Sequence, residues 1–139
     1  MTIRQVWYEA SKELERSDLP RGYREVDGVP IAEYAVGDGG VFALPAPAVF
    51  ENRVRAGIEG RSIWVEYTPL EQQMAANGSV AGIVAGICLA GPVACVVSAV
   101  ISAALITYIS TMGVCPNSQR LVMYYSYNGF VKRDYCGNK

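Results

Sequence analysis

Residues 78–113 read GSVAGIVAGICLAGPVACVVSAVISAALITYISTMG and lie within an uncharged run of 48 residues. Gly91-Pro92 divides this stretch, because proline disrupts a helix interior but is well accommodated in a first helical turn. The pattern predicts an apolar helical hairpin with arms at about 71–90 and 92–112, the second capped by Gly113. A helix that is apolar on all sides is either buried in protein or immersed in lipid.

The charges divide the 139-residue chain after residue 77. Residues 1–77 carry eight Lys and Arg against twelve Asp and Glu, whereas residues 78–139 carry four against one and hold all four cysteines. In the first part, residues 6–16 (VWYEASKELER) suit a short helix, and alternating apolar residues with the turn dipeptide Asp27-Gly28 predict a small β-rich module. We therefore expect an α+β fold with this β-rich module, a central apolar helical hairpin and a C-terminal β-hairpin.

The composition excludes several classes of function. The chain contains no His, so it lacks imidazole bases, Ser–His and Cys–His nucleophile pairs and histidine metal sites. No phosphate-loop Lys follows Asp38-Gly39-Gly40, and no Cys-x-x-Cys spacing suggests zinc. The low number of cations argues against nucleic-acid binding. We expect no enzyme activity, catalytic residue, cofactor, metal site or nucleic-acid partner.

The four cysteines form two candidate pairs. Cys88 and Cys95 flank the Gly91-Pro92 turn symmetrically, and both a disulfide and two buried free thiols fit this position. Cys115 and Cys136 bracket the last segment, and a disulfide between them is predicted. An even number of cysteines in one small module favours an oxidising location.

The C-terminal hairpin is predicted from Asn128-Gly129, the strongest short turn signal in the chain. A two-residue turn there pairs Tyr125 with Lys132 and Leu121 with Cys136. The N-terminus lacks the apolar core of a secretory signal, so we expect secretion or membrane association without a signal peptide.

Two groups of residues are predicted to act at a membrane. Small residues recur at i, i+4 spacing in both arms of the apolar hairpin, which allows close approach of helix backbones. Aromatic and basic residues of the C-terminal hairpin suit a membrane interface and anionic head groups, although cross-strand packing explains the aromatic residues equally well. The predicted insertion and packing residues are Gly82, Gly86, Gly91, Pro92, Ser98 and Ser102. The predicted lipid-contact residues are Arg120, Tyr124, Tyr125, Tyr127, Phe130, Lys132 and Arg133.

The order of features resembles a bacteriocin precursor, in the stretch GSVAGIVAGICLAGPVACVVSAVISAAL with its cysteine pairs. In that class an acidic first part keeps the peptide harmless, and a basic, Gly/Ala/Val-rich second part is released to permeabilise membranes. Gly39-Gly40 superficially resembles a double-glycine processing site. The resemblance implies an antimicrobial-type, pore-forming protein in which residues 1–77 shield residues 78–139. Its partners would be an anionic lipid bilayer and, through self-association, further copies of the chain.

Two other classes of protein fit the same sequence. The first is a non-enzymatic soluble structural or binding module that buries the hairpin. The second is a small membrane-anchored subunit. The arm at 92–112 is long enough to cross a hydrocarbon core of ~30 Å, whereas the first arm has only 11 strongly apolar residues, 80–90. The absence of charge on every face favours membrane contact.

Overall fold

One antiparallel sheet runs through the chain, with its strands side by side in sequence order. The structure is a computed structural model that describes residues 2–51, 63–126 and 131–137. The strands are β1 (Arg21–Val26), β2 (Val29–Val36), β3 (Gly40–Pro45), β4 (Trp64–Tyr67), β5 (Leu121–Tyr125) and β6 (Val131–Cys136). The helices are α1 (Ile3–Arg16), α2 (Pro47–Glu51), α4 (Pro69–Ala76), α5 (Ala81–Cys88), α6 (Pro92–Met112) and the short 3-10 helix η2 (Pro116–Ser118).

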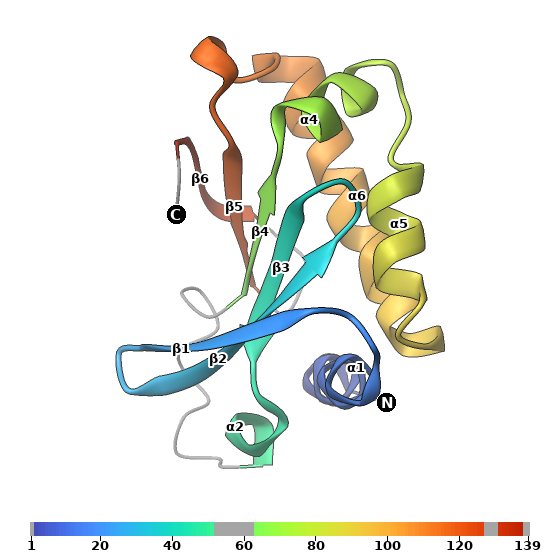
Figure 1. Cartoon of the computed structure of the whole chain (residues 1–139), viewed down its shortest axis with the longest axis vertical. Helices are drawn as coiled ribbons and strands as arrows, with labels where there is room; N and C mark the ends of the chain where they lie inside the picture. Colours follow the sequence, from blue (N-terminus) through green and yellow to red (C-terminus); the bar gives the residue numbers. More distant parts are fainter. Residues whose placement is uncertain (1, 52–62, 127–130, 138–139) are drawn as a thin grey trace.

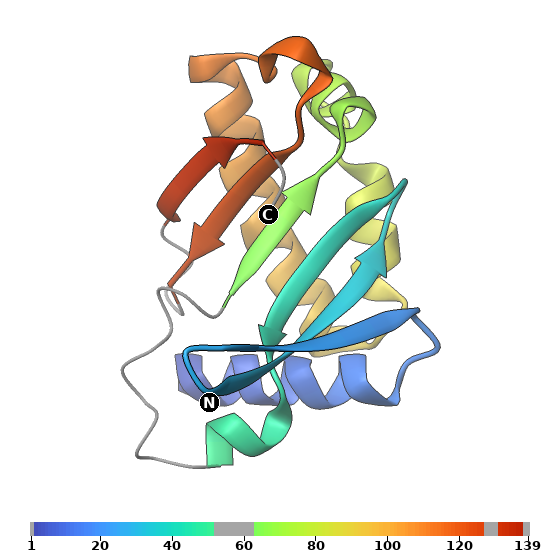
Figure 2. The same ribbon diagram turned by 60° about the vertical axis from the view of Figure 1, so that its left-hand side comes forward.

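Helices α1, α5 and α6 lie on the same side of the sheet (Figure 1; Figure 2). The α+β class predicted from the sequence is confirmed. The two predicted modules share this sheet, because β4 from the first pairs with β5 from the second. Helix α1 also packs on α6. Residues on both sides of the charge boundary therefore build the same core.

The second arm of the apolar hairpin is predicted correctly. Helix α6 begins at Pro92 and ends at Met112, and Gly113 follows with a φ of 78°. The first arm is not the single helix expected at 71–90 but two helices, α4 and α5. Gly78, with a φ of 81°, ends α4, and the N–H of Ser79 returns to the carbonyl of Met74. A left-handed residue of this kind stops a helix whatever the polarity of its neighbours.

The two predicted β-hairpins correspond to two pairs of neighbouring antiparallel strands, β1 with β2 and β5 with β6. Asp27 and Gly28, each with a positive φ, connect β1 to β2 as expected for a two-residue turn. In the second hairpin Leu121 pairs with Cys136 as predicted. A β-bulge at Tyr124/Tyr125, however, places Val131 opposite Tyr125, so the predicted Tyr125–Lys132 pairing is wrong. The predicted turn residues, Tyr127, Asn128, Gly129 and Phe130, lie outside the described residues.

The central strands of the sheet are apolar on both faces. Alternate residues such as Phe42, Val65 and Met123 pack under the helices, and their neighbours on the opposite face form a smaller cluster around Trp64. The helices contribute the buried side of α6 and the apolar side of α1 to the larger core. The buried side of the apolar hairpin is thus a core element of the fold.

Gly86 allows α5 to approach β2 closely. A Cβ atom at this position would lie 2.7 Å from the backbone nitrogen of Gly37 and 3.4 Å from Cα of Val36. Backbone atoms cannot move aside as a side chain can, so Gly86→Ala should lower the free energy of unfolding by about 1–3 kcal/mol in urea denaturation.

The matched control is Gly82→Ala in the same helix. A Cβ atom there would meet only the side-chain oxygen Oδ2 of Asp38, at 3.2 Å. Alanine also favours a helix over glycine by about 1 kcal/mol, so this variant should be as stable as the wild type. Equal stability of the two variants would show that α5 does not rest on β2 in solution.

Candidate functional site

The solvent side of α5 and α6 is apolar and uncharged. Helix α6 buries one side, with Val97, Ile101 and Leu105 facing the core. The opposite side, here called the outer face, exposes small and hydroxyl residues together with four larger apolar side chains. These four are Leu89 (79 % exposed), Val96 (62 %), Val100 and Met112. Among the described residues, α6 is the one helix long and apolar enough to cross a membrane, with a mean hydropathy of 2.2.

The hydroxyl groups on the outer face are already hydrogen-bonded. Thr107, Ser110 and Thr111 donate to the carbonyl oxygens four residues earlier, at 3.0, 2.6 and 3.0 Å. A hydroxyl that bonds back to its own helix needs no water. The polar side chains near the end of α6 therefore do not oppose contact with an apolar medium.

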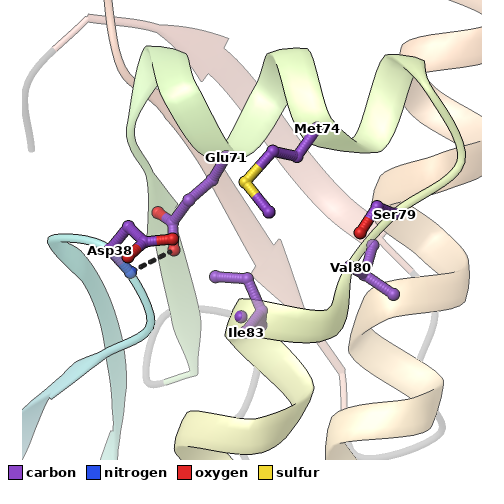
Figure 3. A pocket seen from close by; sticks show the side chains of 7 residues that line it. Asp38, Glu71, Met74, Ser79, Val80 and Ile83 are labelled. Carbon is purple, nitrogen blue, oxygen red and sulfur yellow. Dashed lines mark hydrogen bonds between the residues drawn. The ribbon is translucent and has the colours of Figure 1, made fainter.

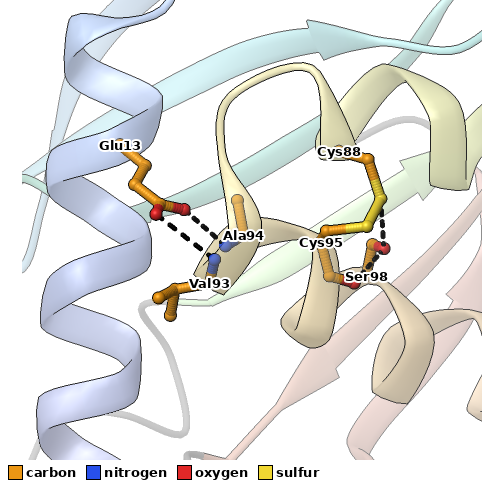
Figure 4. The surroundings of a disulfide bond; sticks show 6 residues. All are labelled: Glu13, Cys88, Val93, Ala94, Cys95 and Ser98. Carbon is orange, nitrogen blue, oxygen red and sulfur yellow. Dashed lines mark hydrogen bonds between the residues drawn. A yellow bond between two sulfur atoms is a disulfide. The ribbon is translucent and has the colours of Figure 1, made fainter.

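The turn between α5 and α6 is held from two sides (Figure 4). The sequence leaves open whether Cys88 and Cys95 form a disulfide or are two free thiols. In the structure they form a disulfide. The carboxylate of Glu13 on α1 accepts hydrogen bonds from the N–H groups of Val93 (3.2 Å) and Ala94 (2.7 Å). A helix N-terminus has such unpaired donors and favours a negative charge.

Gly91 is required where α1 meets this turn. Its φ is 154°, and a Cβ atom would lie 2.5 Å from the carboxyl carbon of Glu13. Pro92 is the first residue of α6, and its missing N–H is not needed there. The structure thus places Gly91 and Pro92 at a junction with α1.

The small residues that recur at i, i+4 spacing in α5 and α6 have different neighbours. Gly86 faces β2, as described above, and Gly82 approaches Asp38. Ser98 is buried, with its hydroxyl donating to the carbonyl of Cys95 and lying 3.5 Å from the sulfur of Cys88. Ser102 is buried too, and its hydroxyl has no hydrogen-bond partner among the described residues. In this fold these small residues pack against other parts of the same chain. Their packing between copies of the chain stays a prediction.

Those predicted aromatic and basic residues that the structure describes do not gather into one cluster. Tyr125 is fully buried beneath the helices, so its assignment to lipid contact is wrong for this fold. Tyr124 lies on the opposite face of the sheet against Trp64. Arg120 donates to the carbonyl of Gly39 and lies 3.8 Å from a carboxylate oxygen of Glu66. The remaining described members, Lys132 and Arg133, are exposed on β6.

The disulfide between Cys115 and Cys136 is confirmed and ties the end of β6 to the segment after α6. Buried Gln72 supports the same segment: its amide accepts from the N–H of Cys115 (2.8 Å) and donates to the carbonyl of Gln119 (3.0 Å). The sequence offers no signal for this role of Gln72, because its partners are more than 40 residues away.

A second buried polar group lies where the β2–β3 turn meets α4 (Figure 3). The carboxylate of Glu71 accepts from the N–H groups of Thr68 (3.0 Å) and Asp38 (3.2 Å). Burial raises the pKa of Glu71, and these hydrogen bonds partly oppose the increase. Gly40 is needed beside it, since a Cβ atom there would lie 2.6 Å from Oε1 of Glu71.

This arrangement joins the β2–β3 turn to the start of α4. The adjoining cavity, about 10 Å³, has room for one water molecule. The Thr68-x-x-Glu71 spacing is a capping-box signal from which the role of Glu71 could have been predicted. Among the described residues, no three His, Cys, Asp or Glu side chains form a group that could hold a metal ion.

Buried tyrosines make the fold sensitive to alkali. The hydroxyls of Tyr67 and Tyr125 lie 3.1 Å apart beneath α6. Burial raises the pKa of both well above the usual range, and it raises the pKa of Tyr34 to about 12. Their neutral forms are favoured by folding, so the associated stability is complete below pH 10 and is lost as pH rises above it.

Tyr67→Phe tests this dependence. Between pH 9 and pH 11 the wild type should lose about 1.4 kcal/mol more unfolding free energy than the variant, because ionisation of Tyr67 favours the unfolded chain. Urea denaturation at both pH values measures the difference. Parallel losses in the two proteins would mean that Tyr67 ionises as readily in the folded state as in the unfolded one.

The outer face is thus an exposed apolar surface without a charged residue. The chain matches no protein-family model, no curated protein and no solved structure.

Proposed function

We propose that this is a secreted, membrane-active protein of the antimicrobial type, which contacts an anionic bilayer through the outer face of α5 and α6. The observation that carries the proposal is the exposure of Leu89 and Val96 on a hairpin without a charged residue. Soluble monomers usually limit such patches, and larger ones mark protein or membrane contacts.

The chemistry of the outer face supports lipid as the contact. Its hydroxyl groups at Thr107, Ser110 and Thr111 are bonded to their own helix, so transfer out of water costs little. Exposed Lys132 and Arg133 on β6 supply positive charge for approach to anionic head groups. The two disulfides indicate an oxidising, extracellular-type environment, where a membrane-active protein meets its target.

Contact and permeabilisation make different demands on the fold. The outer face can rest on a bilayer without any rearrangement. Permeabilisation requires α6 to leave the sheet, which breaks the hydrogen bonds from Val93 and Ala94 to Glu13 and exposes the buried side of α6. The Cys88–Cys95 disulfide would keep the two arms together during this step. We therefore propose surface contact first and hairpin detachment second.

Flotation of the full chain with anionic vesicles tests the contact, and release of a trapped dye tests permeabilisation. The double variant Leu89→Glu/Val96→Glu places two charges on the outer face and should reduce vesicle binding at least tenfold. Tyr23→Glu is the matched control, since Tyr23 is equally exposed (64 %) but lies on β1. This control should bind like the wild type.

A soluble binding module is the second candidate, favoured by the burial of Ile101 and Leu105 in the main core. A wild-type chain that stays at the bottom of the gradient and leaves vesicles intact would support it and exclude the membrane proposal. Flotation without dye release would limit the function to membrane attachment.

A further inference from the structure

A groove lies beside α6, on the side away from α1. Its volume is about 450 Å³, within the range of small-molecule sites. Its lining residues come from helix α6 on one side and from strands β5 and β6 on the other. The residues that decide its character are Val100, Ala103, Thr107 and Tyr108 of α6, Met123 of β5 and Asp134 of β6.

The groove is apolar along its length and polar at one place. Ala103 keeps it open by its small size, and the Thr107 hydroxyl is bonded to the Ala103 carbonyl. The remaining polar groups are the hydroxyl of Tyr108 and the carboxylate of Asp134. Burial, and secondly the charge of Asp134, raise the pKa of Tyr108, which is consistent with a partly desolvated hydroxyl near this carboxylate.

The charge at the groove is negative. Asp134 forms no ion pair within residues 2–51, 63–126 and 131–137. An acyl chain complements the apolar walls, and an ammonium group complements Asp134. Among membrane lipids, these two groups occur together in zwitterionic phospholipids.

We propose that the groove between α6 and the β5–β6 hairpin binds one acyl chain of a zwitterionic phospholipid, with the ammonium group of the lipid at Asp134. This inference rests on the proposed membrane contact and adds a site for a single lipid to it. Tyr108 supplies an aromatic surface near the ammonium group, an arrangement that favours cations. Of the outer-face residues, Val100 also lines the groove, whereas Leu89 and Val96 do not.

The test uses dodecylphosphocholine below its micelle concentration, with dodecyl sulfate as an anionic probe of equal chain length. Calorimetric titration of the full chain should give saturable 1:1 binding of dodecylphosphocholine. Ala103→Phe fills the groove and should weaken this binding at least tenfold. Ala99→Phe is the matched control, because Ala99 is also exposed on α6 but does not line the groove. It should change the affinity less than twofold.

Asp134→Asn tests the head group. It should weaken dodecylphosphocholine binding about threefold and strengthen dodecyl sulfate binding. The proposal is overturned by a lack of saturable binding, by equal loss in Ala99→Phe, or by a head-group preference that Asp134→Asn leaves unchanged. Vesicle flotation of the wild type separates the two proposals: a wild type that floats but does not bind the phosphocholine probe removes the groove site alone. Saturable probe binding without wild-type flotation removes the proposed membrane function alone.

Discussion

Replacing Cys115 and Cys136 together by serine is expected to lower the free energy of unfolding by about 3.5 kcal/mol and the Tm by about 10 °C. The disulfide closes a loop with a sequence separation of 21 that contains η2, β5 and β6. Without it the unfolded chain gains the conformational freedom of this loop. The folded chain keeps the β5–β6 pairing and the hydrogen bonds of Gln72.

The double variant Cys88→Ser/Cys95→Ser is the matched control. Its disulfide spans a separation of only seven residues, so the expected loss is smaller, about 2.5 kcal/mol. Thermal and urea denaturation of both variants and the wild type give the comparison. A larger loss for the Cys88/Cys95 pair would mean that this bridge does more than shorten a loop, and would point to the junction with Glu13.

The sequence predicts those features that depend on neighbouring residues. Pro92 and Gly113 define the ends of α6, and Asp27-Gly28 defines the first hairpin, because each acts through its own backbone conformation. The pairing of Leu121 with Cys136 follows from the same kind of local signal. The bulge that displaces Lys132 from Tyr125 has no such signal and shifts the register by one residue.

Features that depend on distant contacts could not be predicted from composition. Helix α6 is apolar on all sides, so its hydrophobic pattern does not reveal which side is buried; the sheet decides that Ile101 is covered and Val96 is exposed. Tyr125 has the composition of an interfacial residue but lies on the helix-covered face of β5. Glu13 reaches α6 across 80 positions of sequence.

Ile101→Ala is expected to lower the free energy of unfolding by about 3–4 kcal/mol, as is usual for a fully buried aliphatic side chain. Ile101 lies on the buried side of α6, is 0 % exposed and belongs to the main core. Its neighbour Val100 is 45 % exposed, so Val100→Ala should cost less than about 1 kcal/mol. Urea denaturation in the absence of lipid measures both variants. Similar small losses would mean that α6 is not held against the sheet in water.

The same two variants separate surface contact from insertion. Detachment of α6 from the sheet exposes Ile101 to the same extent as unfolding does, so Ile101→Ala lowers the cost of detachment by a similar amount. If permeabilisation proceeds through detachment, this variant should release vesicle dye at least tenfold faster at a temperature where it is still folded. Val100→Ala does not ease detachment, because Val100 is already exposed on the outer face; it should release the dye no faster than the wild type. Dye release that is insensitive to Ile101→Ala would mean that α6 stays on the sheet at the membrane, and that any leakage arises from the outer face alone.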